Sequence, residues 1–409
     1  MIHSKQIEKD FHWVGVYDFD LRIFDIIMET PYGTMYNSYL LQTQKGNVLF
    51  ETVKKEFTKE SLEHIEEVIG KDGTIDYIVL NHTEPDHSGS LIYLLEKYPN
   101  ATIIATQAAL NNIKYIGHIS SSTKTIDTSK NKSFDLGNYH LKFLIQPFLH
   151  WPDTMFTVIE ELNILVTCDF LGCHYAEEQL IDEYVDGKDE LMERMYTHYF
   201  NSVMSPFKQY VLKGIELIEN KMGFSVDELN MVCCSHGPIL KKNIGKVIEL
   251  YRTLAQPIVL KNKIVIVYGS AYGYTKRMAE KIKEGIVSVG FEVVVFDIAV
   301  TSIQTILQEF EDAKGLLIGS PTIVGDAIPQ FYQLLSHLNP IVHCKRFVQC
   351  FGSYGWSGEG VKNLVERIKQ LKVKEINKPL CCRFQPSLEM KHQCVEWGKD
   401  FIEKIEKSK

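Results

Sequence analysis

The hydrophobic pattern divides the chain into two parts that differ in how strands and helices follow one another. From about residue 255 onward, β-branched runs alternate with amphipathic helical stretches, and glycine-containing loops separate them. The β-branched runs begin near residues 263, 291, 315 and 346. Strands that alternate with helices in this way are typical of a parallel, doubly wound sheet. The second part is therefore predicted to be an α/β domain of that kind.

The first part mixes short strands and helices. Buried-strand runs cover residues 73–80, 101–106, 139–146 and 163–169, and a final strand lies within residues 229–238. A polar helical stretch over roughly residues 176–222 separates the last two. A length of 409 residues suits two domains at roughly 100–200 residues each. We place the boundary so that the domains cover residues 1–254 and 255–409.

Candidate metal ligands recur where strands of the first domain end. The loop "NHTEPDHSGS" follows the strand at residues 73–80 and contains two histidines and two carboxylates. Single ligands follow downstream, in "LHWPDT", "TCDFLG" and "CSHGP". Loops at one edge of a sheet converge, so we expect these side chains to meet. The set is His82, Glu84, Asp86, His87, His150, Asp169 and His236.

The spacing of the first four candidates predicts how they point. His82, Glu84 and Asp86 alternate, so an extended loop would direct them to one side and turn His87 away. Taken singly, each downstream ligand also has an ordinary interpretation, such as a buried histidine, a turn former or a strand-end residue. Jointly they supply three or four imidazoles and three carboxylates, which is enough for two metals that share a carboxylate. This donor set suits redox-active iron, and it suits zinc or manganese as well.

Composition and charge limit the kinds of partner that we expect for this protein. The chain is 45% hydrophobic and 23% charged, as in ordinary globular proteins, and its net charge of −8 disfavours nucleic acid or an anionic membrane as the main partner. No apolar run approaches the roughly 18 residues of a membrane span, and the start lacks a signal-peptide core. Nine cysteines without a C-x-x-C pair suit reduced thiols. We expect a cytoplasmic protein.

Three loops of the second domain are candidates for binding a flat, phosphorylated ligand. "YGSAYGYTKR" ends a strand and opens a helix, where backbone N–H groups can cradle a phosphate. "GSPTIVGDAIP" and "GSYGWSGEG" fall at the carboxyl ends of later strands, where such folds bind ligands. The aromatic residues could stack on a ring or pack on the following helix. The candidates are Ser270, Tyr272, Gly273, Tyr274, Thr275, Pro321, Thr322, Ile323, Gly325, Ser353, Tyr354, Gly355, Trp356 and Gly358.

The metal-rich loop and the three downstream ligands resemble the metallo-β-lactamase-like domain of flavodiiron proteins. Zinc hydrolases of that fold usually show H-x-H-x-D-H, whereas Glu84 stands at the second position here, as in the diiron branch. The resemblance implies an αββα sandwich with Asp169 bridging two irons. It implies one iron held by His82, Glu84 and His150, and the other by Asp86, His236 and His87.

The same resemblance implies further residues near the irons. His174 and Tyr199 stand where the family has groups close to the substrate, so they are the candidate catalytic residues. Leu171 departs from the family's D-x-F-G-x-H pattern, in which phenylalanine is usual at that position.

The three loops of the second domain together resemble the FMN site of flavodoxins, as found at the carboxyl end of flavodiiron proteins. Tyr274 stands where a small hydroxyl residue is usual, and Val324 and Gly325 stand where two asparagines are common. The first strand–loop–helix segment of the second domain lacks a G-x-G-x-x-G nicotinamide fingerprint, so FMN is preferred to NAD as its cofactor. The implied fold of this domain is a flavodoxin-like doubly wound parallel sheet.

The resemblance covers nearly the whole chain and implies a flavodiiron oxidoreductase that reduces O2 to water, NO to N2O, or both. Its cofactors would be two non-haem iron ions and FMN. Two ferrous ions and a reduced flavin together hold the four electrons that O2 requires. An external redox protein, rubredoxin-like or a flavin reductase, would supply electrons to this two-domain form. The family also implies a head-to-tail homodimer or a dimer of dimers.

Two alternatives remain open on the sequence. One is a zinc-dependent hydrolase of the metallo-β-lactamase fold with a flavodoxin-like regulatory domain, against which Glu84 argues. The other is a flavodoxin-like electron carrier whose first domain is a binding module, which would require the ligand set to be a coincidence.

Overall fold

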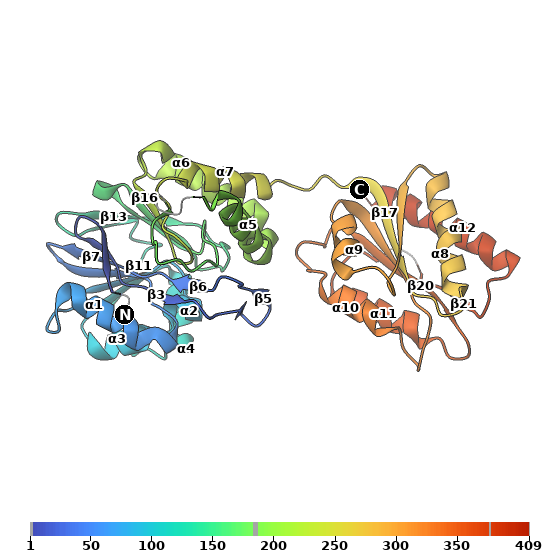
Figure 1. Cartoon of the computed structure of the whole chain (residues 1–409), viewed down its shortest axis with the longest axis horizontal. Helices are drawn as coiled ribbons and strands as arrows, with labels where there is room; N and C mark the ends of the chain where they lie inside the picture. Colours follow the sequence, from blue (N-terminus) through green and yellow to red (C-terminus); the bar gives the residue numbers. More distant parts are fainter. Residues whose placement is uncertain (1–2, 183–186, 376–377, 409) are drawn as a thin grey trace. The chain divides into compact units, whose positions relative to one another are not determined.

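The computed structural model describes residues 3–182, 187–375 and 378–408. Contacts divide the chain into two compact units, Met1–Gln256 and Pro257–Lys409 (Figure 1). In the part of the chain that is described, no helix is both long enough and apolar enough to cross a membrane.

Unit 1 is built on two sheets. Seven strands form the first sheet in the order β1-β2-β7-β8-β9-β10-β11, and five form the second in the order β12-β13-β14-β15-β16. The strands of the first sheet are Lys5–Glu8, Phe11–Trp13, Tyr39–Thr43, Gly46–Phe50, Tyr77–Leu80, Thr102–Ala105 and Thr125–Asp127. Those of the second are Ser133–Asp135, His140–Ile145, Met155–Ile159, Ile164–Cys168 and Met231–Cys234. Two small ribbons add β3 (Val16–Asp18) with β6 (Thr34–Tyr36), and β4 (Ile23–Phe24) with β5 (Met28–Glu29).

The two sheets of unit 1 face each other across a shared core. On β8, Val48 and Phe50 point into this core, together with Val166 of β15, whereas Leu49 points to the opposite face. The inner strands of both sheets are covered on both faces: their successive side chains point to opposite sides, and most of them are apolar and buried. Helices occupy the outer layers, so the architecture is an αββα sandwich.

The helices of unit 1 fall into two groups. Against the outer face of the first sheet lie α1 (Thr58–Ile69), α3 (Leu91–Lys97) and α4 (Gln107–Ile116). Against the second sheet lie α5 (Asp189–Tyr199), α6 (Lys208–Lys221) and α7 (Ile244–Leu254) (Figure 1). One further short helix, α2 (Pro85–Ser88), follows β9.

The helical stretch predicted over residues 176–222 is too long. The described residues 176–182 are irregular, and α5 begins only at Asp189, after Gly187 takes a left-handed φ of 75°. A π-helical turn over Phe200–Met204 and a short turn over Ser205–Phe207 then separate α5 from α6. Pro206 lies in that second turn, where its missing N–H group prevents a continuous helix.

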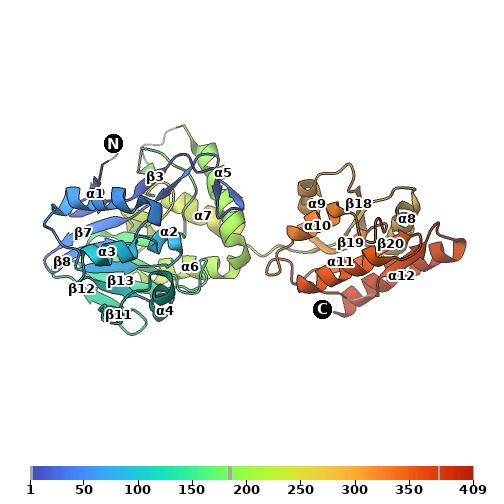
Figure 2. The ribbon, with the colours of Figure 1, turned by 90° about the horizontal axis from the view of Figure 1, so that it is seen from below.

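Unit 2 is a single parallel sheet in the order β18-β17-β19-β20-β21. Its strands are Lys261–Tyr268, Glu292–Asp297, Ala313–Gly319, Phe347–Tyr354 and Leu380–Arg383, numbered β17 to β21 along the chain. Its helices, α8 to α12, are Tyr274–Ser288, Ile303–Phe310, Pro329–Ser336, Glu359–Gln370 and Leu388–Lys407. Helices α8 and α12 cover one face and α9, α10 and α11 the other (Figures 1 and 2). The predicted fold class, a sandwich followed by a doubly wound sheet, is confirmed.

Helices α8 and α12 approach each other closely because each carries a glycine at the contact. A Cβ at Gly285 of α8 would overlap the backbone oxygen of Val395, and one at Gly398 of α12 would overlap that of Ile282. Hydrogen is the only side chain that fits at either position.

We predict that Gly285→Ala destabilises unit 2 by about 1–3 kcal/mol, because the added methyl group forces two packed helices apart. Gly245 of α7 is the matched control: it is helical and exposed, and no atom lies within 4 Å of a Cβ built there. Gly245→Ala should be neutral or stabilise by up to about 1 kcal/mol. Denaturant unfolding of both variants measures the difference, and equal midpoints would show that the α8–α12 contact tolerates a methyl group.

Candidate metal centre

Seven side chains from four segments of unit 1 meet in one buried cluster. His82 and Glu84 follow β9, and Asp86 and His87 lie on α2. The other three follow β13, β15 and β16. All seven predicted ligands are thus brought together, mainly in two groups of mutually close donor atoms, and a third group joins His87 and Asp169 with Cys168. The two main groups are His82, Glu84, His150 and Asp169 in one, and Asp86, His87 and His236 in the other.

The first group surrounds one oxygen of Asp169. His150 Nε2 lies 3.2 Å and His82 Nε2 lies 3.7 Å from Asp169 Oδ2. Glu84 closes this group, because its Oε2 atom lies 2.9 Å from His150 Nε2 and 3.2 Å from His82 Nε2.

The second group surrounds the other oxygen of the same carboxylate. His87 Nε2 lies 2.7 Å and His236 Nε2 lies 3.5 Å from Asp169 Oδ1. Asp86 Oδ2 lies 3.2 Å from His87 Nε2 and 3.1 Å from His236 Nε2. One carboxylate therefore presents one oxygen to each half of the cluster.

The prediction that His87 turns away from the site is wrong. The loop does not stay extended, because Pro85 begins the short helix α2 and its fixed φ suits a first helical residue. In the helical turn His87 faces the cluster. Its carbonyl oxygen accepts hydrogen bonds from Thr52 N at 2.8 Å and from Thr52 Oγ1 at 2.7 Å.

Mutual pairing controls the charge of the cluster. Burial acts to lower the pKa of His87, but the nearby carboxylates of Asp86 and Asp169 outweigh it and raise this pKa to about 9. The pKa of His150 is raised to about 9 against the same effect of burial, by Asp169 and Glu84. Burial conversely acts to raise the pKa of Asp169, but the surrounding imidazoles hold it well below its usual value.

Two groups, the Asp153 carboxylate and the Met35 carbonyl, hold the outer faces of two imidazoles. Asp153 Oδ1 lies 3.3 Å from His82 Nδ1, and Asp153 Oδ2 accepts a hydrogen bond from Thr83. The carbonyl oxygen of Met35 lies 2.7 Å from His236 Nδ1. Such partners fix the orientation of a metal-binding imidazole. The sequence analysis missed them, although Asp153 was detectable as an acid three residues after His150.

The two candidate catalytic residues border the cluster without joining the two groups of donor atoms. The ring centres of His174 and His236 are 4.7 Å apart, and those of His174 and Tyr199 are 5.0 Å apart. His174 Nδ1 lies 2.8 Å from Thr34 Oγ1. Burial and the neighbouring His236 lower the pKa of His174 well below its usual value.

A surface pocket of about 520 Å³ reaches the cluster. Glu84 and Asp86 form part of its wall, together with Phe24 and Asp25 of the β4–β5 ribbon. Burial and the charges of Glu84 and Asp86 raise the pKa of Asp25 to about 6. No feature of the local sequence had indicated this ribbon as part of the site.

The cluster fits metal ions by its chemistry. Both carboxylate oxygens of Asp86, both ring nitrogens of His87 and Asp169 Oδ1 are buried; His87 Nε2 lies at ion-pair distance from Asp86 and Asp169, but none of these atoms makes a hydrogen bond of normal geometry among the described residues. Buried polar atoms are normally satisfied, so this concentration of exceptions indicates atoms that bind something else. Imidazole nitrogens and carboxylate oxygens are ligands suited to iron.

The three loops predicted to bind a flavin converge at the carboxyl ends of β17, β19 and β20. Thr275 Oγ1 lies 2.8 Å from Ser353 Oγ, which joins the first loop to the third. Thr322 N donates a hydrogen bond to the carbonyl oxygen of Ser353 at 3.0 Å, which joins the second loop to the third. Ser270 Oγ accepts a hydrogen bond from Lys276 N at 3.3 Å.

These loops are open where a phosphate and a flat ring would approach them. Gly273 precedes α8 with a φ of 77°, and Gly325 has a φ of 74°; no atom lies within 4 Å of a Cβ built at either position. A small pocket of about 40 Å³ lies between Thr322, Gly325 and Trp356. The Trp356 side chain is 87% exposed, so it does not pack on the following helix and is available to a ligand. The residues present fit FMN.

The remaining predicted FMN contacts lie on the same three loops. Tyr272 is exposed, and its ring centre lies 6.2 Å from that of Tyr274, the first residue of α8. Tyr354 packs beneath Gly358, whose φ is 80°. The others on these loops are Pro321, Ile323 and Gly355.

Comparisons with known proteins agree with both sites. Residues 34–237 match the family model of the ODP family beta lactamase, and residues 266–398 match that of flavodoxin. The chain is 38% identical to the flavo-diiron protein FprA2 of Clostridium acetobutylicum, over 98% of this chain and 99% of that protein. It is 33% identical to a nitric oxide reductase of Moorella thermoacetica, over 98% of each.

A solved structure shows the same fold. The rubredoxin oxygen:oxidoreductase of Desulfovibrio gigas superposes with a TM-score of 0.72 at 26% identity, covering 99% of this chain and 98% of that one. Both domain models, the full-length relatives and this structure point to one family. This chain belongs to the flavodiiron proteins, whose name implies a flavin and two iron ions.

Proposed function

We propose that this protein is a flavodiiron oxidoreductase that reduces O2 to water, NO to N2O, or both, at a non-haem diiron site supplied with electrons by FMN. The observation that carries the proposal is the position of Asp169. Its two oxygens face two separate sets of imidazole and carboxylate donors, as a bridging ligand between two metals requires. The names of the relatives, a nitric oxide reductase and a rubredoxin oxygen:oxidoreductase, support the reduction of both gases.

The ligand assignment follows from the two groups. We propose that one iron is held by His82, Glu84 and His150, and the other by Asp86, His87 and His236, with Asp169 between them. When bound, the two ferrous ions and the reduced FMN would supply four electrons and Lewis acidity for the gas. Asp153 and the Met35 carbonyl keep their imidazoles in place, so that Nε2 of each faces inward.

Residues beside the metal cluster would control the substrate. Phe24 and Tyr199 give apolar faces next to His174 and His236, which restrict water around a small apolar gas. His174 remains neutral because of its lowered pKa, and its buried Nε2 atom has no hydrogen-bond partner among the described residues. We propose that this atom holds a hydrogen bond to the substrate or to a product water.

The proposal includes the domain limits and the setting. The division of contacts between residues 256 and 257 supports a diiron domain over residues 1–254 and an FMN domain over residues 255–409. All nine cysteines are free thiols, which supports a cytoplasmic location. The electron donor would be a separate redox protein, a rubredoxin-like protein or a flavin reductase.

The zinc hydrolase is the alternative function, and the relatives do not favour it. Anaerobic purification followed by metal and flavin analysis distinguishes the two. Iron with FMN, together with consumption of O2 or NO in the presence of a chemically reduced donor, supports the oxidoreductase. Zinc without iron and without gas consumption would support the hydrolase.

We propose that two chains assemble head to tail, so that the flavin of one chain serves the irons of its partner. The metal ligands and the FMN loops belong to different compact units, and each unit exposes apolar side chains beside its site. Ile26 and Ile27 lie exposed on the ribbon that borders the metal pocket. Val324 and Trp356 lie exposed on the FMN loops. Exposed apolar groups of this kind mark interaction surfaces, and a two-fold pair would cover both at once.

We predict that His82→Ala, Glu84→Ala and His236→Ala each abolish gas reduction while FMN still binds and is still reduced. The reason is that these ligands lie in one unit and the FMN loops in the other. Gas consumption and the visible absorption of the flavin measure the two properties. His140→Ala is the control, since His140 is a half-exposed histidine that pairs with Glu161 far from the cluster. Loss of FMN from the His82 variant would show that the sites are not independent.

We predict that Asp169→Asn lowers the iron content more than His87→Ala does. The carboxylate offers an oxygen to each half of the cluster and offsets the charge of both, so the amide should weaken both metal sites together. Iron per chain is the measurement. Retention of both irons by Asp169→Asn, with loss of one by His87→Ala, would contradict the proposed roles.

We predict that two inactive parents restore activity when mixed. One parent carries His82→Ala and lacks a working metal site; the other carries Gly273→Trp, a bulky change at the phosphate loop. A co-expressed mixed dimer holds one intact pair, flavin from the first chain and irons from the second, and should recover at most about half of the normal rate. Persistent inactivity of a demonstrably mixed, metal-loaded dimer would show that electrons pass within one chain.

A further inference from the structure

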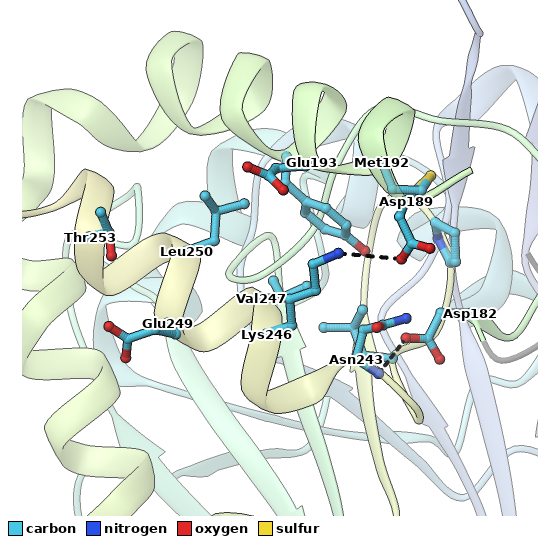
Figure 3. Close-up of a pocket in the computed structure, with 13 residues that line it drawn as sticks. Asp182, Asp189, Met192, Glu193, Asn243, Lys246, Val247, Glu249, Leu250 and Thr253 are labelled. Atoms are coloured by element: carbon cyan, nitrogen blue, oxygen red, sulfur yellow. Dashed lines mark hydrogen bonds and ion pairs between the residues drawn. The ribbon is translucent and has the colours of Figure 1, made fainter. Parts of the chain in front are cut away.

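A second pocket of unit 1 lies between helices α5 and α7 and has a volume of about 460 Å³. It is lined by one face of each helix, at positions three and four residues apart (Figure 3). On α5 these positions include Met192, Glu193 and Tyr196, and on α7 they include Val247 and Leu250. Its volume falls within the roughly 300–1,000 Å³ of typical sites for small molecules.

The pocket combines apolar walls with one unsatisfied polar atom. Met192, Val247 and Leu250 contribute aliphatic surface. Tyr196 also lines the pocket; its buried phenol oxygen interacts with the weakly hydrogen-bonding thiol of Cys173 and makes no hydrogen bond of normal geometry in the described part of the chain. A buried hydroxyl is normally satisfied, so this atom is suited to a hydrogen bond with a bound molecule.

The rim of the pocket is acidic, and most of its charges are already paired. Asp189 lies 3.3 Å from Lys246 (Figure 3). Glu249 pairs with Arg252, which lies outside the pocket. Glu193 is exposed at the rim and forms no hydrogen bond or ion pair with any residue that the structure describes. A cation at the rim would therefore find an unneutralised carboxylate.

The other acidic residue of the wall has a structural role. Asp182 accepts hydrogen bonds from the backbone N–H groups of Lys241, Lys242 and Asn243, which hold the start of α7. Its negative charge still adds to the field at the rim, where Lys246 is the single basic group among the lining residues.

We propose that this pocket binds a small organic amine, with its apolar or aromatic body between α5 and α7 and its ammonium group at Glu193. The apolar walls match the body, the Tyr196 phenol offers a hydrogen bond at depth, and the acidic rim selects a cation over an anion. The site is separate from the seven metal ligands and does not depend on the proposed reaction.

Three probes with the same ring test the proposal on the full-length protein. Tryptamine carries a cation, indole is neutral and indole-3-propionate carries an anion. Calorimetry and ligand-observed NMR should give the order of affinity tryptamine, indole, indole-3-propionate. Metal and flavin contents are measured on the same samples, so that failure of the amine site is distinguished from failure of the proposed redox function.

Two pairs of variants locate the site. Leu250→Trp fills the pocket and should weaken the binding of tryptamine and of indole at least about tenfold. Leu254→Trp, on the same helix but outside the lining, should leave both unchanged. Glu193→Gln should weaken the binding of tryptamine about three- to tenfold and leave the binding of indole unchanged. Glu190→Gln, one turn earlier on α5, should change the binding of neither probe.

Circular dichroism verifies that each variant is folded. The proposal is overturned if no probe binds at millimolar concentration, or if the amine and the acid bind equally. It is also overturned if Leu250→Trp retains full binding, or if Glu190→Gln weakens tryptamine as much as Glu193→Gln. Binding of a protein or peptide to this face, in place of the amine, would count against it as well.

Discussion

The structure of unit 1 depends on the compensation of charge around Asp169. Ionisable groups are costly to bury unless opposite charges and hydrogen bonds accompany them. Here four imidazoles and three carboxylates meet in one interior cluster, and Asp169 contacts both halves through separate oxygens. Removal of either kind of group would leave the other uncompensated. The four segments that carry these groups are therefore tied to one another through the cluster as well as through the sheets.

Most of the cluster could be predicted because its members lie directly after strands. Polar groups at the ends of buried strands stand out in the sequence, and parallel neighbours bring them to one edge. The orientation of His87 could not be predicted, because alternation along an extended loop and a short helix beginning at Pro85 are both compatible with the spacing. The outer partners were missed for another reason. Asp153 and the Met35 carbonyl act through tertiary contacts with His82 and His236. Such contacts leave no periodic pattern in the sequence.

The FMN loops show more clearly what the sequence pattern cannot predict. The repeat of strand and helix predicted a parallel sheet with these loops at the carboxyl ends of its strands, so the convergence of three loops followed from the fold. Two hydrogen bonds join these loops, one between the hydroxyls of Thr275 and Ser353 and one between the backbone groups of Thr322 and Ser353. They link positions that are far apart in the sequence, so they carry no local signal. In the same way, the acidic rim beside α7 follows from the packing of two helices that no sequence motif distinguishes.

Unusual backbone conformations accompany the loops that deliver the ligands. Cys168, immediately before Asp169, has a φ of 52°, and the register between β15 and β16 shifts between Val166 and Cys168. Such an irregularity at the end of a strand redirects the next side chain. Glu51, next to the Thr52 that holds the carbonyl of His87, has a φ of 59°. Non-glycine residues are uncommon in this region and persist only where the surroundings fix them. The two packed sheets supply that restraint, and the strand ends can therefore hold a carboxylate and an imidazole in positions that a relaxed loop would not adopt.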